Sequence, residues 1–151
     1  MTSLIREMKI EDAQNVSEVA VSSFMQAVSS QLSDEGVNTF LGISTPDSFL
    51  ERISKDNLMF VSEDDDGING VVELKEGRHI AMLFIKPNKQ RNGIGRQLIE
   101  EALKYSRVGT VTVSASLVSV SAYEKYGFIT VGAEEEKSGL RYQPMQIELG
   151  V

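Results

Sequence analysis

Apolar residues recur every three or four positions in parts of the chain, a spacing that predicts amphipathic helices. In the first such segment, Val16, Val19 and Phe24 mark one face. In the second, Pro46 suits the first helical turn. The pattern of residues 29–44 is ambiguous and predicts no element. The predicted helices cover residues 11–28, 45–55, 93–106 and 117–126.

Shorter apolar runs predict strands. The run from Ile80 to Ile85 is apolar on both faces, as is typical of a central strand, and Pro87 ends it because proline cannot donate to a strand ladder. The predicted strands cover residues 4–7, 58–62, 68–74, 79–86, 110–114, 128–133 and 141–149. We predict one α/β (α+β) domain over residues 1–151, with a mixed, mostly antiparallel central sheet flanked by helices.

Helical geometry also predicts which side chains of the last two helices are buried. In the helix at 93–106, the buried face is expected to hold Ile94, Leu98, Ala102 and Tyr105. In the helix at 117–126, it is expected to hold Val118, Ala122 and Tyr126. Tyr123 lies about 100° from Ala122 around that helix, so it need not share this face.

Composition narrows the function classes. The 151 residues include no cysteine, which excludes disulfides, cysteine-based zinc sites and a cysteinyl intermediate. A net charge of −7 disfavours a nucleic-acid partner and mildly favours a cationic one. The start of the chain does not resemble a signal peptide, and its apolar runs are too short to span a membrane. We therefore expect a cytoplasmic protein with no membrane partner.

A glycine-rich stretch, QRNGIGR, follows the central strand and opens the next helix. It matches neither the P-loop nor the dinucleotide-binding fingerprint. Helix N-terminal amides lack internal partners and attract anions, and Gly93 and Gly95 would leave them accessible. Arg91 and Arg96 would add charge-assisted contacts. The stretch is either an anion site or a tight turn that needs glycine for its geometry.

Two acidic stretches suggest other possibilities. Ser62 to Gly67, with Glu73 in the twelfth place, approaches the calcium-loop pattern. However, Ser62 stands where aspartate is required, and the flanking sequences predict strands, so we interpret EDDDG as a solvated hairpin turn. The run at 134–136 is also interpreted as solvated, with the alternative that it edges an acceptor cleft.

Two motifs carry a resemblance to a known family. IKPNKQRNGIG, from Ile85 to Gly95, resembles the acyl-CoA signature of the GCN5-related N-acetyltransferases (GNAT), and AYEKYGF, from Ala122 to Phe128, resembles their Y-E-K-x-G-F segment. The predicted element order also matches that family. The resemblance implies a GNAT-like fold with a splayed acyl-CoA-binding cleft.

The resemblance also implies which residues bind acetyl-CoA. The backbone of the central strand would pair with pantetheine, and the amides of the glycine loop would hold the pyrophosphate. Ser116, or alternatively Ser114, stands where many relatives carry a cofactor-binding asparagine. The cofactor-binding residues implied are Leu83, Phe84, Ile85, Gln90, Arg91, Asn92, Gly93, Ile94, Gly95, Arg96 and Ser116.

Acetyl transfer by direct attack of an amine needs an oxyanion donor, an acid for the leaving thiolate and a route for the amine proton. By resemblance, a backbone N–H near Leu83 or Phe84 is the oxyanion donor and Tyr123 is the acid. The strand TVTVSAS offers no carboxylate, so Glu73 and His79 are the alternative bases.

The sequence therefore predicts an acetyl-CoA-dependent N-acetyltransferase that acts, without a metal, on a primary amine of a small molecule or protein. The alternatives are a catalytically silent acyl-CoA-binding regulatory module and a calcium-binding interaction protein. The resemblance implies that the acceptor cleft is walled at about residues 22–57 and 134–141. The acceptor is not readable from the sequence, and a homodimer remains open.

Overall fold

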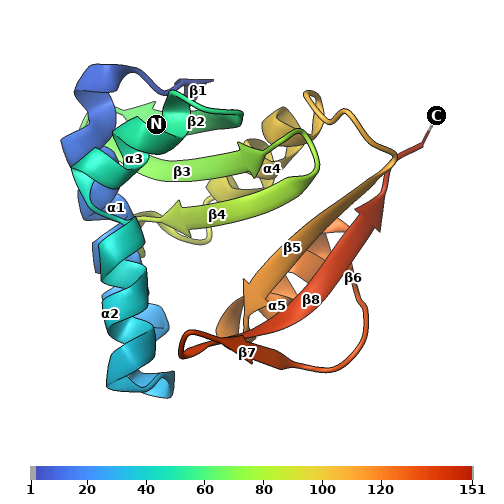
Figure 1. Cartoon of the computed structure of the whole chain (residues 1–151). Coiled ribbons are helices and arrows are strands. Elements are labelled where there is room, and N and C mark those ends of the chain that lie inside the picture. Colours follow the sequence, from blue (N-terminus) through green and yellow to red (C-terminus); the bar gives the residue numbers. More distant parts are fainter. Residues whose placement is uncertain (1–2, 151) are drawn as a thin grey trace.

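One eight-stranded sheet organises the molecule (Figure 1), and the computed structural model describes residues 3–150. The strand order is β1-β2-β3-β4-β5-β8-β6, and β7 pairs with β8. All pairs are antiparallel except β4 with β5. The strands are β1 (Leu4–Glu7), β2 (Asn57–Asp64), β3 (Gly67–Lys75), β4 (His79–Ile85), β5 (Thr110–Ser116), β6 (Ile129–Thr130), β7 (Glu135–Lys137) and β8 (Leu140–Glu148).

Helices cover both faces of the sheet, and each face has its own apolar core. Helices α1, α2 and α3 contribute to the first core, and α4 and α5 contribute to the second. The helices are α1 (Ala13–Ala27), α2 (Asp34–Ile43), α3 (Pro46–Ile53), α4 (Ile94–Leu103) and α5 (Val120–Tyr126). Short 3₁₀ turns are η1 (Ile10–Asp12), η2 (Ser29–Gln31), η3 (Pro87–Lys89) and η4 (Leu117–Ser119). Within the described part of the chain, none of the helices combines the length and the hydropathy needed to cross a bilayer.

The predicted mixed, mostly antiparallel sheet with flanking helices is confirmed, with three local differences. The ambiguous segment 29–44 contains helix α2, capped by Ser33, whose Oγ accepts from the Gly36 amide at 3.3 Å. The predicted strand 128–133 shrinks to β6, and β7 forms at Glu135–Lys137, where no strand was predicted. Tyr105 lies beyond the end of α4 and is 49% exposed, so its predicted burial is wrong.

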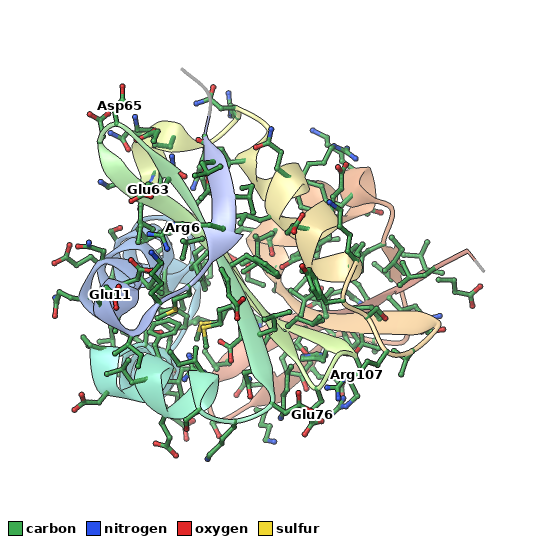
Figure 2. All side chains as sticks on the ribbon, turned by 90° about the horizontal axis from the view of Figure 1, so that it is seen from above. Arg6, Glu11, Glu63, Asp65, Glu76 and Arg107 are labelled. Atoms are coloured by element: carbon green, nitrogen blue, oxygen red, sulfur yellow. The ribbon has the colours of Figure 1, made fainter. Side chains whose placement is uncertain are left out.

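Strand β1 is fastened to the sheet by an arginine. The Arg6 guanidinium donates to Asp12 Oδ2 at 2.8 Å and to Glu63 Oε1 of β2 at 3.1 Å. Arg6 and Glu63 accordingly lie next to each other in Figure 2. The hydrogen bond from Arg6 lowers the pKa of Asp12, so the pair persists well into the acidic range.

Strands β4 and β5 stay together over a short distance. Their parallel pairing comprises His79 with Thr112 and Ile80 with Val113. Strand β4 continues along β3 to Ile85, and β5 continues along β8 to Ser116. The two halves of the sheet therefore diverge, as Figure 1 shows for β3–β4 and β5–β8.

A second contact joins the two halves at the far side of this divergence, between α2 and the β7–β8 turn. The Thr39 hydroxyl donates to the carbonyl of Ser138 at 2.8 Å. Gly36 lies against Gly139 so closely that a Cβ on either residue would overlap the backbone of the other. Gly139 also has a φ of 80°, which favours glycine. The contact therefore depends on two residues without side chains.

We predict that Gly36→Ala destabilises the protein by about 1–3 kcal/mol, because backbone must move to admit the methyl group. Gly42→Ala is the matched control in the same helix, since its Cβ meets nothing within 4 Å. Removing a helical glycine there should stabilise by about 0.5–1 kcal/mol. Urea unfolding of both variants measures the difference, and equal midpoints would contradict the close contact.

Candidate functional site

A cleft of about 1130 Å³ opens where β4 and β5 diverge. Its walls come from α1, α2, β4, β5, α5 and β8, and from the loop before α4. Residues of both apolar cores line it, so the cleft passes through the sheet from one face to the other. The sequence-predicted site residues that line it are Leu83, Phe84, Ile85, Gln90, Arg91, Gly93, Arg96, Ser116 and Tyr123.

The last three residues of β4 present a strand edge to the cleft. Leu83, Phe84 and Ile85 pair with β3 on one side, whereas the pairing with β5 has ended at Ile80. A register shift places Ala81 in a bulge just before them. The backbone of these residues can therefore accept an extended ligand as an additional strand.

The loop between β4 and α4 contains two left-handed residues. Arg91 has a φ of 68°, and Gly93, which caps α4, has a φ of 78°. Left-handed residues at such spacing are typical of turns whose successive backbone N–H groups form a concave surface, and this turn precedes a ten-residue helix. Such a surface can bind an anion such as a diphosphate.

Two predicted residues of this loop support its own backbone. The side-chain amide of Gln90 donates to the backbone carbonyl of Ile85 at 3.2 Å. The side-chain amide of Asn92 donates to the backbone carbonyl of Lys89 at 3.3 Å. Asn92 lies outside the set of cleft-lining residues, as do Ile94 and Gly95. Ile94 packs in the core shared by α4 and α5.

The two glycines of the loop are required for different structural reasons. Gly93 needs its positive φ and has open space above it. Gly95 lies against the hydroxyl of Tyr126, which occupies the position that a Cβ would take. Arg96 adds a second link to α5, because its Nη2 donates to the Lys125 carbonyl at 2.6 Å. Helix α5 therefore holds the N-terminus of α4 in place.

The acidic hairpin after β2 also supports this loop. Lys89, in the 3₁₀ turn η3, lies 2.8 Å from Asp66 Oδ2 and 3.1 Å from Asp64 Oδ2. Asp65, at the tip of the hairpin, points outward in Figure 2. Residues 3–150 contain no group of three or more His, Cys, Asp or Glu side chains arranged to hold a metal. The sequence alone did not indicate that EDDDG anchors the loop through Lys89.

Tyr123 lies in the wall of the cleft and in the core. Its ring packs edge-on against Tyr126 and Phe128, with centroid distances of 5.8 and 5.3 Å. Burial raises its pKa above the ordinary value of a phenol, so the hydroxyl is protonated at neutral pH. The predicted core face of this helix is wrong in part, because Val118 is 41% exposed. The 3₁₀ turn η4 precedes α5 and places Val118 outside the helical spacing.

Glu73 is fully buried and does not itself line the cleft, although it stands opposite the cleft-lining Met82 in the β3–β4 register. Its Oε2 accepts from Arg52 Nε at 2.8 Å and from Asn57 Nδ2 at 2.7 Å. Its Oε1 is buried without a partner among the described residues. The carboxylate is thus neutralised by Arg52 behind the cleft wall formed by Met82.

His79 and Ser116 lie at opposite ends of the strand pair. His79 Nδ1 shares a hydrogen bond of 2.7 Å with the Thr112 hydroxyl where β4 and β5 are still paired, outside the cleft lining. Burial, followed by the charges of Arg78 and Lys75, lowers the pKa of His79. Ser116 lines the cleft at the end of β5, where its hydroxyl shares a 2.8 Å hydrogen bond with that of Ser119. Ser114, the sequence alternative, also lines the cleft.

Comparisons with known proteins agree with this architecture. The family model for the acetyltransferase (GNAT) domain matches residues 28–149. A GCN5-related N-acetyltransferase from Rhodopseudomonas palustris has a TM-score of 0.84 and 23% identity, covering 99% of this chain and 97% of that one. The PaiA N-acetyltransferase from Thermoplasma acidophilum, solved with coenzyme A, has a TM-score of 0.81 and 23% identity, covering 98% and 99%.

More distant likenesses include a spermidine N-acetyltransferase SpeG chimera from Vibrio cholerae and hSSAT. It has a TM-score of 0.65 and 20% identity, covering 98% of this chain and 96% of that one. A search of curated proteins finds no match.

We predict that Gly95→Ala destabilises the protein and that Tyr126→Phe relieves much of this loss in the double variant. The reason is that the Tyr126 hydroxyl occupies the space of the new methyl group, whereas its ring carbon Cζ lies 3.3 Å from that position. Unfolding free energies of the two single variants and the double variant form a double-mutant cycle. We expect a coupling of about 1 kcal/mol or more, and additive effects would disprove the proposed overlap.

Proposed function

This chain belongs to the GNAT family of acetyltransferases and uses acetyl-CoA as its co-substrate, and we propose that it acetylates a primary amine of a small molecule or a protein by direct attack. The observation that carries the proposal is the free edge of β4, which faces a cleft beside the N-terminus of α4.

Acetyl-CoA would lie along the free edge of β4. The amides from Arg91 to Arg96 would hold its diphosphate, and the backbone of Leu83 to Ile85 would pair with pantetheine. Two observations support this placement of acetyl-CoA: the left-handed residues of the loop, and the end of the β4–β5 pairing at Ile80. The thioester would then lie near the point of divergence, where a backbone N–H of Leu83 or Phe84 can donate to the oxyanion.

Tyr123 is proposed as the acid. The amine nitrogen attacks the thioester carbon, a C–N bond forms, and the C–S bond breaks as the oxyanion collapses. The thiolate of coenzyme A then takes the phenolic proton, and the phenolate regains a proton, through water, from the nitrogen that has attacked. The phenol is protonated at neutral pH, and burial raises its pKa, which favours its return to the protonated form after the transfer.

The amine proton is proposed to leave through water. The residues that line the cleft include no aspartate, glutamate or histidine within the described chain. Glu73 is held by Arg52 and Asn57, and His79 is held by Thr112 at the paired end of the strands. Neither side chain lines the cleft, so either residue would act as a base only through water.

Thiol release from acetyl-CoA with a panel of amines between pH 6 and 9 tests this function. We expect release that depends on the amine and rises with pH, because the neutral fraction of an amine with a pKa near 10.4 rises about tenfold per pH unit. Calorimetric binding of coenzyme A is measured in parallel. Binding without release by any amine would instead favour the silent acyl-CoA-binding module.

We predict that Tyr123→Phe lowers kcat at least about 100-fold, the typical contribution of a general acid, and leaves coenzyme A affinity nearly unchanged. The variant removes one hydroxyl and keeps the buried ring. Tyr105→Phe is the matched control, because Tyr105 lies outside the cleft lining and is 49% exposed. An unaltered kcat in Tyr123→Phe would remove this residue from the mechanism.

A further inference from the structure

The cleft has one end that acetyl-CoA would leave unused in the proposed reaction. This end lies on the face of the sheet covered by α1, α2 and α3, opposite the face of α4 and α5 that carries the diphosphate loop. We define it as the acceptor end. We infer that it binds a primary amine with an apolar body and no second positive charge. The inference rests on the proposed function and specifies its acceptor.

The acceptor end is walled by aromatic and aliphatic side chains. The rings of Phe24 and Phe40 are stacked with centroids 3.8 Å apart, and Phe84 meets Phe40 edge-on at 5.2 Å. All three line the cleft. Ile43 and Leu140 extend this wall, and Ile43 is 42% exposed. Phe24 and Phe40 are buried, so the apolar surface that a ligand body would remove from water comes from Ile43 and from the partly buried Phe84 and Leu140.

The charged side chains that line the cleft are all basic. The cleft-lining basic residues are Lys75, Arg91, Arg96, Lys125, Lys137 and Arg141, and no cleft-lining residue of the described chain is acidic. Three of these lie near the proposed diphosphate site. The other three, on β3, β7 and β8, would remain around the acceptor.

Nearby carboxylates do not reverse this sign inside the cleft. Glu135 and Glu136 lie on β7 and are exposed, outside the cleft lining. Glu134 lies 3.8 Å from Arg141, and Glu136 stands opposite Arg141 across β7 and β8, so Arg141 adds little net positive charge. The buried carboxylate of Glu73 is already bonded to Arg52. A second ammonium on the acceptor would find apolar surface and no cleft-lining carboxylate to pair with among the described residues, which disfavours its binding.

The net charge of the whole chain would favour a polyamine, but the charges close to the bound amine should decide the preference. The chain carries a net charge of −7, and this charge mildly favours a cationic partner. Exposed charges are screened over about 8 Å at physiological ionic strength, so carboxylates beyond that distance contribute little inside the cleft, and none lines it among the described residues. We therefore expect selection against polyamines.

Hexylamine and 1,6-diaminohexane form the matched pair of probes, since they share the chain length and differ by the second ammonium. With the intact protein and acetyl-CoA, we expect kcat/KM for hexylamine to exceed that for 1,6-diaminohexane about tenfold or more. Equal values, or a preference for the diamine, would overturn the inference while supporting acetyl transfer.

Binding provides a second measurement that does not need turnover. Calorimetry in the presence of coenzyme A should show tighter binding of hexylamine than of 1,6-diaminohexane. If this order holds without any turnover, the acceptor preference survives and the proposed function fails. If neither amine is acetylated and hexylamine does not bind more tightly, the inference fails.

Ile43→Glu tests the role of charge at the wall, with Ile43→Gln as the control of similar shape. Both variants remove the exposed apolar group, and one of them adds a negative charge. We expect the preference for hexylamine over the diamine to fall at least about threefold further in Ile43→Glu than in Ile43→Gln. Identical preferences in the two variants would contradict the electrostatic part of the inference.

Discussion

The short parallel pairing of β4 and β5 is the constraint on which the site depends. Two residue pairs hold the strands together, and beyond Ile80 each strand follows its own antiparallel partner. A continuous ladder would bury the backbone groups of Leu83 to Ile85 in hydrogen bonds with β5. Because the ladder stops, these groups remain available, and the space between the strands becomes the cleft. The bulge at Ala81 lies at the same point, so the end of pairing and the change in strand direction coincide.

Contacts outside the ladder keep this opening defined. Gly36 and Gly139 meet backbone to backbone between α2 and the β7–β8 turn, and Gly95 meets Tyr126 between α4 and α5. In both cases a missing Cβ allows an approach that no other residue would permit. Lys89 fixes the beginning of the loop between β4 and α4 to the acidic hairpin. The glycines thus act by close packing as much as by exposing amides.

The sequence predicted the central part of the fold well, because its signals are local. The apolar run before Pro87 and the glycine loop after it identified β4 and the start of α4 correctly. Helix α2 was missed because it buries only Gly36 and Phe40, so its apolar spacing is weak. Strand β7 was missed because all three of its residues are exposed and give no alternation.

The site was less predictable where distant residues decide its chemistry. Glu73 and His79 are titratable residues on central strands, but their partners Arg52 and Thr112 lie 21 and 33 positions away in the chain. No local pattern reveals that these partners engage them. Which side chains of α5 face the core depends on the 3₁₀ turn η4 that precedes it. The spacing of apolar residues around Val118 did not indicate this turn. The single sign of the cleft charges likewise appears only after β3, β7, β8 and α5 come together.

The passage of the cleft through the sheet has a consequence for the order of events. Residues of both faces line the cleft, so in the proposed reaction the acyl donor and the amine would occupy different parts of it. Both substrates could then be bound at once as a ternary complex, which is what direct attack of the amine on the thioester requires.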